Sequence, residues 1–121
     1  MTVLEQLAEF IEGANSRYTA NSWLSDDKMN VYVRKGFHVI ANNKAAWTLD
    51  IASVVVHKQK QGTWTDFIHK AHELNPWEAT FVECVHNPIL AAWLGRNGWQ
   101  VAPGLIPESF FLLTNKTAKV T

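Results

Sequence analysis

The chain has 121 residues, of which 47% are hydrophobic and six are tryptophans, so it is unlike disordered chains and can bury a core without disulfides or metals. Eleven basic and eleven acidic residues cancel, which leaves no net charge to attract nucleic acid or an acidic membrane, and no apolar stretch is long enough to span a bilayer. Cys84 is the single cysteine, which excludes an intramolecular disulfide and fits a reducing cytosol. We therefore expect one cytoplasmic domain over residues 1–121, divided into an N-terminal helical region (1–28), a sheet core (29–114) and a tail (115–121), with fraying from Lys116 to Thr121.

The N-terminal segment begins with a helix signal. Thr2 and Glu5 have the spacing of a capping box, and an apolar face follows at Leu4, Leu7, Ala8 and Ile11. This pattern predicts an amphipathic helix over residues 3–12 that ends at Gly13. Residues 14–28 are rich in asparagine and serine and lose the apolar period, which predicts a loop or a second, irregular helix.

Two stretches with a period of two follow. Residues 29–41 alternate apolar and polar side chains, which predicts two short strands or one long bent strand, with a bulge or tight hairpin at Lys35-Gly36. Residues 42–44 form a turn, after which alternation resumes and leads into the unbroken run Val54-Val55-Val56. That run predicts a strand that becomes buried on both faces towards its end.

The second half of the chain alternates helices and strands. Helical spacing from Trp64 to Leu74 is stopped by Asn75-Pro76, and a strand is expected over residues 79–85. Asn87-Pro88 then supplies an N-cap and a first-turn proline for another helix. Short strands over residues 99–102 and 109–114 complete an α/β (α+β) domain with a single mixed sheet flanked by helices.

Residues 54–63 join the most apolar run to a polar turn and a helix. The free N–H groups at a helix N-terminus suit a phosphate, Lys58 and Lys60 add positive charge, and Gly62 allows close backbone approach. Such joints are common, so the alternative interpretation is an ordinary solvated connection.

Two segments together resemble a known family. The run Gln59-Lys60-Gln61-Gly62-Thr63-Trp64 is similar to the Gln/Arg-x-x-Gly-x-Gly/Ala loop of the GCN5-related N-acetyltransferase (GNAT) superfamily, although Trp64 replaces a small residue. The segment from Asn87 to Gly98-Trp99 resembles a second family motif at the right separation. The resemblance covers residues 31–114 and implies a GNAT-like fold. The chain is similar to compact, partly degenerate GNAT-like proteins of the kind that occur in phages.

The resemblance implies that acetyl-CoA (coenzyme A) binds between the strands at residues 51–56 and 79–85, and that an amine of a small molecule or protein attacks the thioester directly in a ternary complex. The catalytic base would be Asp50 or Glu83. The expected cofactor-binding residues are Val54, Val56, Lys58, Gln59, Lys60, Gln61, Gly62, Thr63 and Asn87.

Two features leave the activity open. Asp50 lies in an apolar alternation where burial would raise its pKa, but it could equally be a solvent-facing carboxylate. Leu94 stands where the family has a tyrosine, so the departing thiolate would be protonated by water, Cys84 or His86. The alternative is a non-catalytic GNAT-like binding or structural protein with a phage-associated or protein-interaction role.

Other constellations point to structure. His69 and His72 lie one helical turn apart but lack a nearby glutamate or a second cysteine, so we expect no metal site. Cys84 near His86 has the residue types of a nucleophile and base, whereas a buried structural thiol is the simpler interpretation. The tryptophans fit core packing or a partner interface, including a homodimer.

Overall fold

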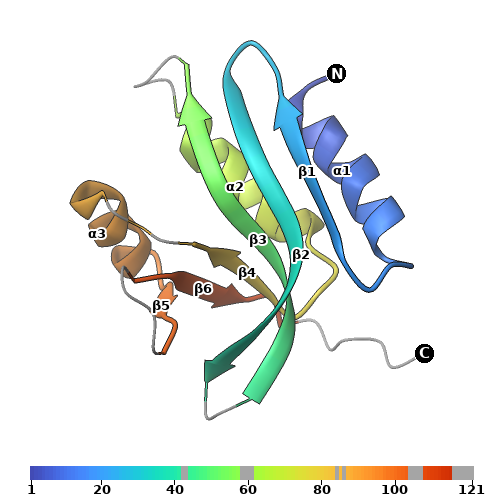
Figure 1. The fold of residues 1–121 in the computed structure, drawn as a ribbon. Coiled ribbons are helices and arrows are strands. Elements are labelled where there is room, and N and C mark those ends of the chain that lie inside the picture. Colours follow the sequence, from blue (N-terminus) through green and yellow to red (C-terminus); the bar gives the residue numbers. More distant parts are fainter. Residues whose placement is uncertain (42–43, 58–61, 84, 86, 104–107, 116–121) are drawn as a thin grey trace.

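A computed structural model describes residues 1–41, 44–57, 62–83, 85, 87–103 and 108–115. These residues form three helices and one six-stranded mixed sheet, so the α+β class and the single sheet predicted from the sequence are confirmed (Figure 1). In chain order the elements are α1 (Val3–Ala14), β1 (Ala20–Ser25), β2 (Met29–Ala41), β3 (Lys44–Val56), α2 (Thr63–Leu74), β4 (Ala79–Val82), α3 (Pro88–Arg96), β5 (Gln100–Val101) and β6 (Phe110–Leu113). Within the described ranges, no helix has the length and apolar character needed to cross a membrane.

The strand order across the sheet is β1-β2-β3-β4-β6-β5. The central pair, β3 and β4, is parallel and joins residues 48–51 to residues 79–82, while all other pairs are antiparallel. The helix α2 forms the crossover that a parallel pair requires. The sheet therefore consists of two antiparallel halves, β1-β2-β3 and β4-β6-β5, that meet at one parallel ladder.

Two apolar clusters lie on opposite faces of the sheet. The main cluster packs α1 and α2 against one face, and Figure 1 shows α2 behind β2 and β3 and α1 next to β1. Its central members are Leu7, Ile11, Val31, Val33, Leu49, Ile51, Phe67 and Ile68. A smaller cluster on the other face packs the far end of the β2–β3 hairpin on β4 and β6, through Ile40, Ala46, Ala79, Phe81, Ala102 and Phe111.

The helix α1 forms as predicted, with both hydrogen bonds of the capping box between Thr2 and Glu5. It extends to Ala14, one residue past Gly13, and buries Val3, Leu7 and Ile11. The strand β2 is one continuous strand of 13 residues, which decides between the two predicted alternatives.

Three predictions are wrong. Residues 14–28 contain the edge strand β1 rather than a loop or helix, because Ala20 to Ser25 pairs with β2 along its whole length. Lys35-Gly36 is neither a bulge nor a turn, since both residues pair regularly with β3. The end of β3 is not buried on both faces, because β4 no longer accompanies it there and Val55 is 50% exposed.

Candidate functional site

A cleft opens where β3 and β4 part. The last cross-strand pair is Ile51 with Val82, and the N–H of Glu83 donates to the Ile51 carbonyl at 3.1 Å. Beyond this point β3 continues to Val56 along β2 alone. The resulting cleft has a volume of about 790 Å³ and is walled by β3, the end of β4 and the first turns of α2 and α3.

A bulge marks the same place. Tyr32 of β2 lies opposite Ser53 and Val33 lies opposite Ile51, so Ala52 is an extra residue in β3. A bulge bends its strand and increases the local twist, and bulges are frequent beside active sites. Here the bulge coincides with the point where β3 turns away from β4.

The stretch of β3 past the bulge presents a free backbone edge to the cleft. Residues 53–56 pair with β2 on one side and have no strand partner on the other within the described part of the chain. Such an edge can hydrogen-bond an extended ligand that carries amide groups. Half-buried Val54 and Val56 add an apolar wall beside it.

The first turn of α2 forms the next part of the wall. Gly62 is the N-cap, with a left-handed φ of 69°, and provides no side-chain cap. The first N–H groups of any helix lack intrahelical partners, and the residues that carry them here, Thr63 to Thr65, line the cleft. The site therefore offers backbone donors and the positive end of a helix dipole to an anion.

Asn87 begins the opposite wall. Its side-chain oxygen accepts hydrogen bonds from the N–H groups of Ile89 at 2.9 Å and Leu90 at 3.4 Å, and this caps α3. Of the predicted cofactor-binding residues, five line the cleft: Val54, Val56, Gly62, Thr63 and Asn87. The other four, Lys58, Gln59, Lys60 and Gln61, lie outside the described residues, as do Cys84 and His86.

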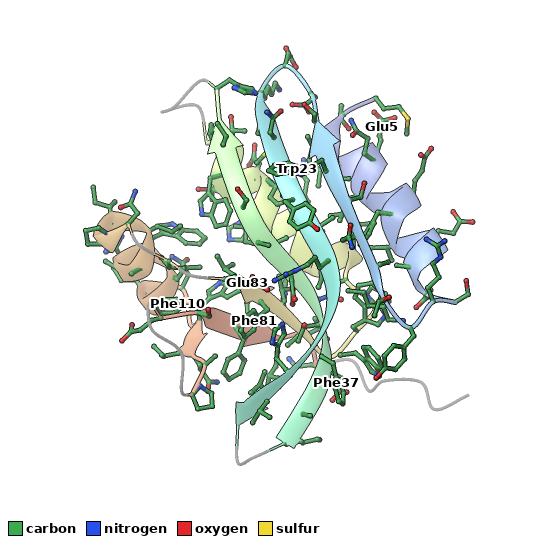
Figure 2. All side chains as sticks on the ribbon, in the orientation of Figure 1. Glu5, Trp23, Phe37, Phe81, Glu83 and Phe110 are labelled. Atoms are coloured by element: carbon green, nitrogen blue, oxygen red, sulfur yellow. The ribbon has the colours of Figure 1, made fainter. Side chains whose placement is uncertain are left out.

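The two carboxylates singled out in the sequence lie close together, and one of them lines the cleft. Asp50 is 2% exposed; it accepts a hydrogen bond from Thr48 Oγ1 at 2.6 Å and contacts His38 Nε2 at 2.8 Å. This excludes the solvent-facing alternative for Asp50. Glu83, which is labelled in Figure 2, lines the cleft itself and pairs with the guanidinium of Arg34.

His38 and Gly36 complete this cluster, and sequence reasoning missed both, together with Arg34. The imidazole of His38 stacks on Phe81 with ring centroids 4.1 Å apart and contacts Asp50, whose carboxylate lies against Gly36. A Cβ atom on Gly36 would lie 2.1 Å from Asp50 Oδ2, so only glycine leaves room for that carboxylate. The sequence signal that could have found them is their spacing: Arg34, Gly36 and His38 are two residues apart, so they lie on one face of a strand.

The cluster shifts two pKa values. Burial and, next, the negative charge of Asp50 raise the pKa of Glu83, while the Arg34 guanidinium opposes the shift. The hydrogen bond to Asp50 raises the pKa of His38 against the opposing effect of burial. A carboxylate with a raised pKa is a better proton acceptor, so Glu83 has the character of a general base at the cleft.

His38, Asp50 and Glu83 also offer three potential metal-ligand atoms that lie within 4.8 Å of one another. Arg34 pairs with Glu83 and lies 4.0 Å from Asp50, so its guanidinium already supplies the positive charge that a cation would bring. We therefore treat the cluster as an acid–base group. His69 and His72 belong to no such group in the described ranges; His69 is exposed, and His72 Nδ1 lies 2.8 Å from Thr80 Oγ1.

Two further residues shape the cleft's chemistry. Leu94, at the position where a proton donor would stand, is fully buried in the main apolar cluster. Trp64 lines the cleft, and its indole N–H is buried without a partner among the described residues.

Comparison with models of known protein families, with curated proteins and with solved structures finds no match. The function therefore has to be inferred from the residues of the cleft and from their geometry.

Proposed function

We propose that this protein is a GNAT-like, acetyl-CoA-dependent N-acetyltransferase. The observation that carries the proposal is the cleft between two diverging parallel strands, which is lined both by the first turn of α2, with glycine at its N-cap, and by Glu83. The strand order β1-β2-β3-β4-β6-β5 brings the two segments of the sequence resemblance, at Gly62 and Asn87, to opposite walls of this single cleft.

The walls fit the chemistry of coenzyme A. Its pantetheine arm is extended and contains amides, which suits the free edge of β3 beside Val54 and Val56. Its pyrophosphate is an anion, which suits the first turn of α2 after Gly62. The thioester would then lie towards the bulge and Glu83.

Glu83 is the base in this proposal and Asp50 supports it. Glu83 faces the cleft and takes a proton from the ammonium of the acceptor, after which the amine nitrogen attacks the thioester carbonyl and the C–S bond breaks. Asp50 is buried behind it with both oxygens engaged, so it acts on Glu83 through its charge. The departing thiolate takes its proton from water or from the hydroxyl of Ser53, which lines the cleft next to the bulge.

One observation favours a second candidate, a protein that binds coenzyme A without catalysis. Leu94 is apolar and fully buried, so α3 supplies no proton donor from that position. Binding requires only the β3 edge and the first turn of α2, whereas turnover also requires a route for the thiolate's proton.

The test is calorimetric titration with acetyl-CoA. We expect binding by the natural protein and a loss of at least about 10-fold in affinity in Gly62→Glu, because a carboxylate at the helix N-terminus repels the pyrophosphate. Gly98→Glu is the matched control, since Gly98 also has a positive φ, of 86°, and open space around it but does not line the cleft.

Absence of binding at millimolar acetyl-CoA would overturn the proposal. Consumption of the thioester that disappears in Glu83→Gln, while binding persists, identifies the enzyme. Binding without consumption identifies the second candidate.

A further inference from the structure

We propose that His38 carries protons between Glu83 and the solvent on the sheet face opposite α1 and α2, as the proton outlet of the acetyl transfer. This inference rests on the proposed function, because it concerns the proton that Glu83 takes from the acceptor. It adds a residue on a different strand, which faces away from the helix layer.

The contacts form a short chain from the cleft to the far face. His38 Nε2 lies 4.0 Å from Glu83 Oε1 and 2.8 Å from Asp50 Oδ2. Side-chain exposure rises along the cluster, from 2% for Asp50 to 16% for Glu83 and 27% for His38. Glu83 thus lines the cleft, His38 is the most solvent-exposed of the three side chains, and Asp50 is buried beside both.

The other members of the cluster cannot take this role. Arg34 of β2 also faces Glu83, but a guanidinium does not give up its proton in proteins. Asp50 of β3 is enclosed, and its two oxygens are engaged by Thr48 and His38. Histidine is the side chain whose ordinary pKa lies near neutrality, and its raised pKa here suits it to hold a proton that leaves Glu83.

The ring of His38 is held in position for this exchange. Its stacking on Phe81, with an angle of 4° between the ring planes, fixes one face, and the missing side chain at Gly36 opens the path to Asp50. The 4.0 Å between Glu83 Oε1 and the ring leaves the transfer to bridging water, which can reach the ring nitrogen that Asp50 does not occupy.

The proton balance closes over one turnover. The carboxylate of Glu83 takes a proton from the acceptor ammonium and becomes a carboxylic acid while the free amine attacks. The acid then passes this proton through water to Nδ1 of neutral His38, because Nε2 already carries the proton that it donates to Asp50. The ring becomes an imidazolium paired with Asp50, and Nδ1 then releases its proton to the solvent. Glu83 returns to the carboxylate that the next acceptor needs.

The first test is a titration of the histidine side chains by nitrogen-15 NMR, which needs neither acceptor nor coenzyme. We expect the His38 pKa to fall in Glu83→Gln, because the neighbouring negative charge is lost, and to stay unchanged in His69→Gln, a change at an exposed histidine of α2. An unchanged His38 pKa in Glu83→Gln would show that the charge of Glu83 does not act on His38, and it would overturn the proposal.

The second test is chemical rescue of turnover, measured as thioester consumption with a primary amine. We expect His38→Ala to lose about 10-fold or more in rate and to recover with added imidazole, because a proton carrier can be replaced by a free one. A loss that imidazole does not restore would mean that His38 is only structural. If the natural protein consumes no thioester, the proposed function fails, whereas the NMR titration still decides whether His38 and Glu83 are coupled.

Discussion

Gly36 determines the geometry of the carboxylate cluster although it carries no functional group. It lies opposite Thr48 in the β2–β3 ladder, two residues from both Arg34 and His38 on the same face of β2. The side chain of Asp50 fills the space that any larger residue at this position would occupy. The sequence requirement at Gly36 is therefore imposed by a carboxylate on the neighbouring strand.

Gly36→Ala is expected to destabilise the protein by about 1–3 kcal/mol, because the new methyl group overlaps Asp50 in a packed strand pair. The measurement is urea unfolding. Most of the loss should disappear in the double variant Gly36→Ala/Asp50→Ala relative to Asp50→Ala alone, since the overlapping carboxylate is then gone.

Gly13→Ala is the matched control, because nothing lies within 4 Å of the added Cβ in α1. Alanine there should be neutral or stabilising. A Gly36→Ala variant as stable as this control would contradict the proposed packing of Asp50.

At the scale of single residues, the sequence predicted two of the five members of the cluster, Asp50 and Glu83. Asp50 and Glu83 stand out because charged residues are unusual in apolar strands. Arg34 and His38 do not, because polar residues are ordinary on an alternating strand and their role depends on which strands become neighbours. That information is absent from the local pattern.

Single side chains also join whole elements. Asp26, in the turn between β1 and β2, accepts from the N–H of Val3 at 2.9 Å and so fixes the start of α1. The same carboxylate accepts from the N–H groups of Lys28 at 2.8 Å and Met29 at 3.0 Å, which shapes the turn. One residue thus sets the position of a helix relative to an edge hairpin.

Asp26→Ala is expected to lower the free energy of unfolding by about 1–3 kcal/mol, because backbone donors at a helix start and a turn lose their acceptor together. Urea unfolding measures the change. Asp27→Ala is the control, since Asp27 is the exposed neighbour in the same turn. Equal losses of stability in both variants would show that the loss of a negative charge in this turn, and not the loss of these hydrogen bonds, is responsible.

Helices with a clear periodic pattern of apolar residues were predictable from the sequence, while the strand β1 was not. Capping signals and apolar spacing located α1, α2 and α3 because these features act within a few residues. The strand β1 is rich in asparagine and serine and forms because β2 offers it a ladder. The Gln6 side chain of α1 further holds it through both the N–H and the carbonyl of Ser25.

At the level of the whole molecule, the shifted pKa values predict how stability depends on pH. The folded pKa of His38 is raised above 6.5, so its contribution is complete below pH 6.5 and is lost as pH rises through the folded value. The pKa of Glu83 is raised above 4.5, so deprotonation above that value also destabilises the folded state. Partial burial opposes the shift at Asp26, but its three backbone donors lower the pKa below 3.8, so that contribution is lost in acid.

Thermal unfolding across this pH range should therefore show stability that declines on the alkaline side of pH 6.5 and again below pH 3.8. His38→Gln should flatten the alkaline decline and Asp26→Asn the acid one, each without affecting the other. If both variants kept the natural profile, these groups would not control it.

The overall class followed from the order of the elements. The family resemblance implied a ligand between residues 51–56 and 79–85, but the local pattern alone does not predict the cleft. Predicting it requires knowing that β3 and β4 are parallel neighbours and that they separate after Ile51. The bulge at Ala52 can be recognised only from the pairing of β3 with β2, because one extra residue in a strand produces no recognisable pattern of apolar and polar residues. The valine run was consequently interpreted as a doubly buried strand end, although it forms the cleft wall.

The four-residue ladder between β3 and β4 has a mechanical consequence. It is the seam between two antiparallel half-sheets, and beyond it the halves diverge around the cleft. Because this ladder is the strand pairing that joins the two half-sheets in the described part of the chain, a relative rotation of the halves would have to take place here. A ligand that touches both Val54 and Val85 would contact both half-sheets at once. Binding in the cleft would therefore limit how far the two half-sheets can rotate relative to each other.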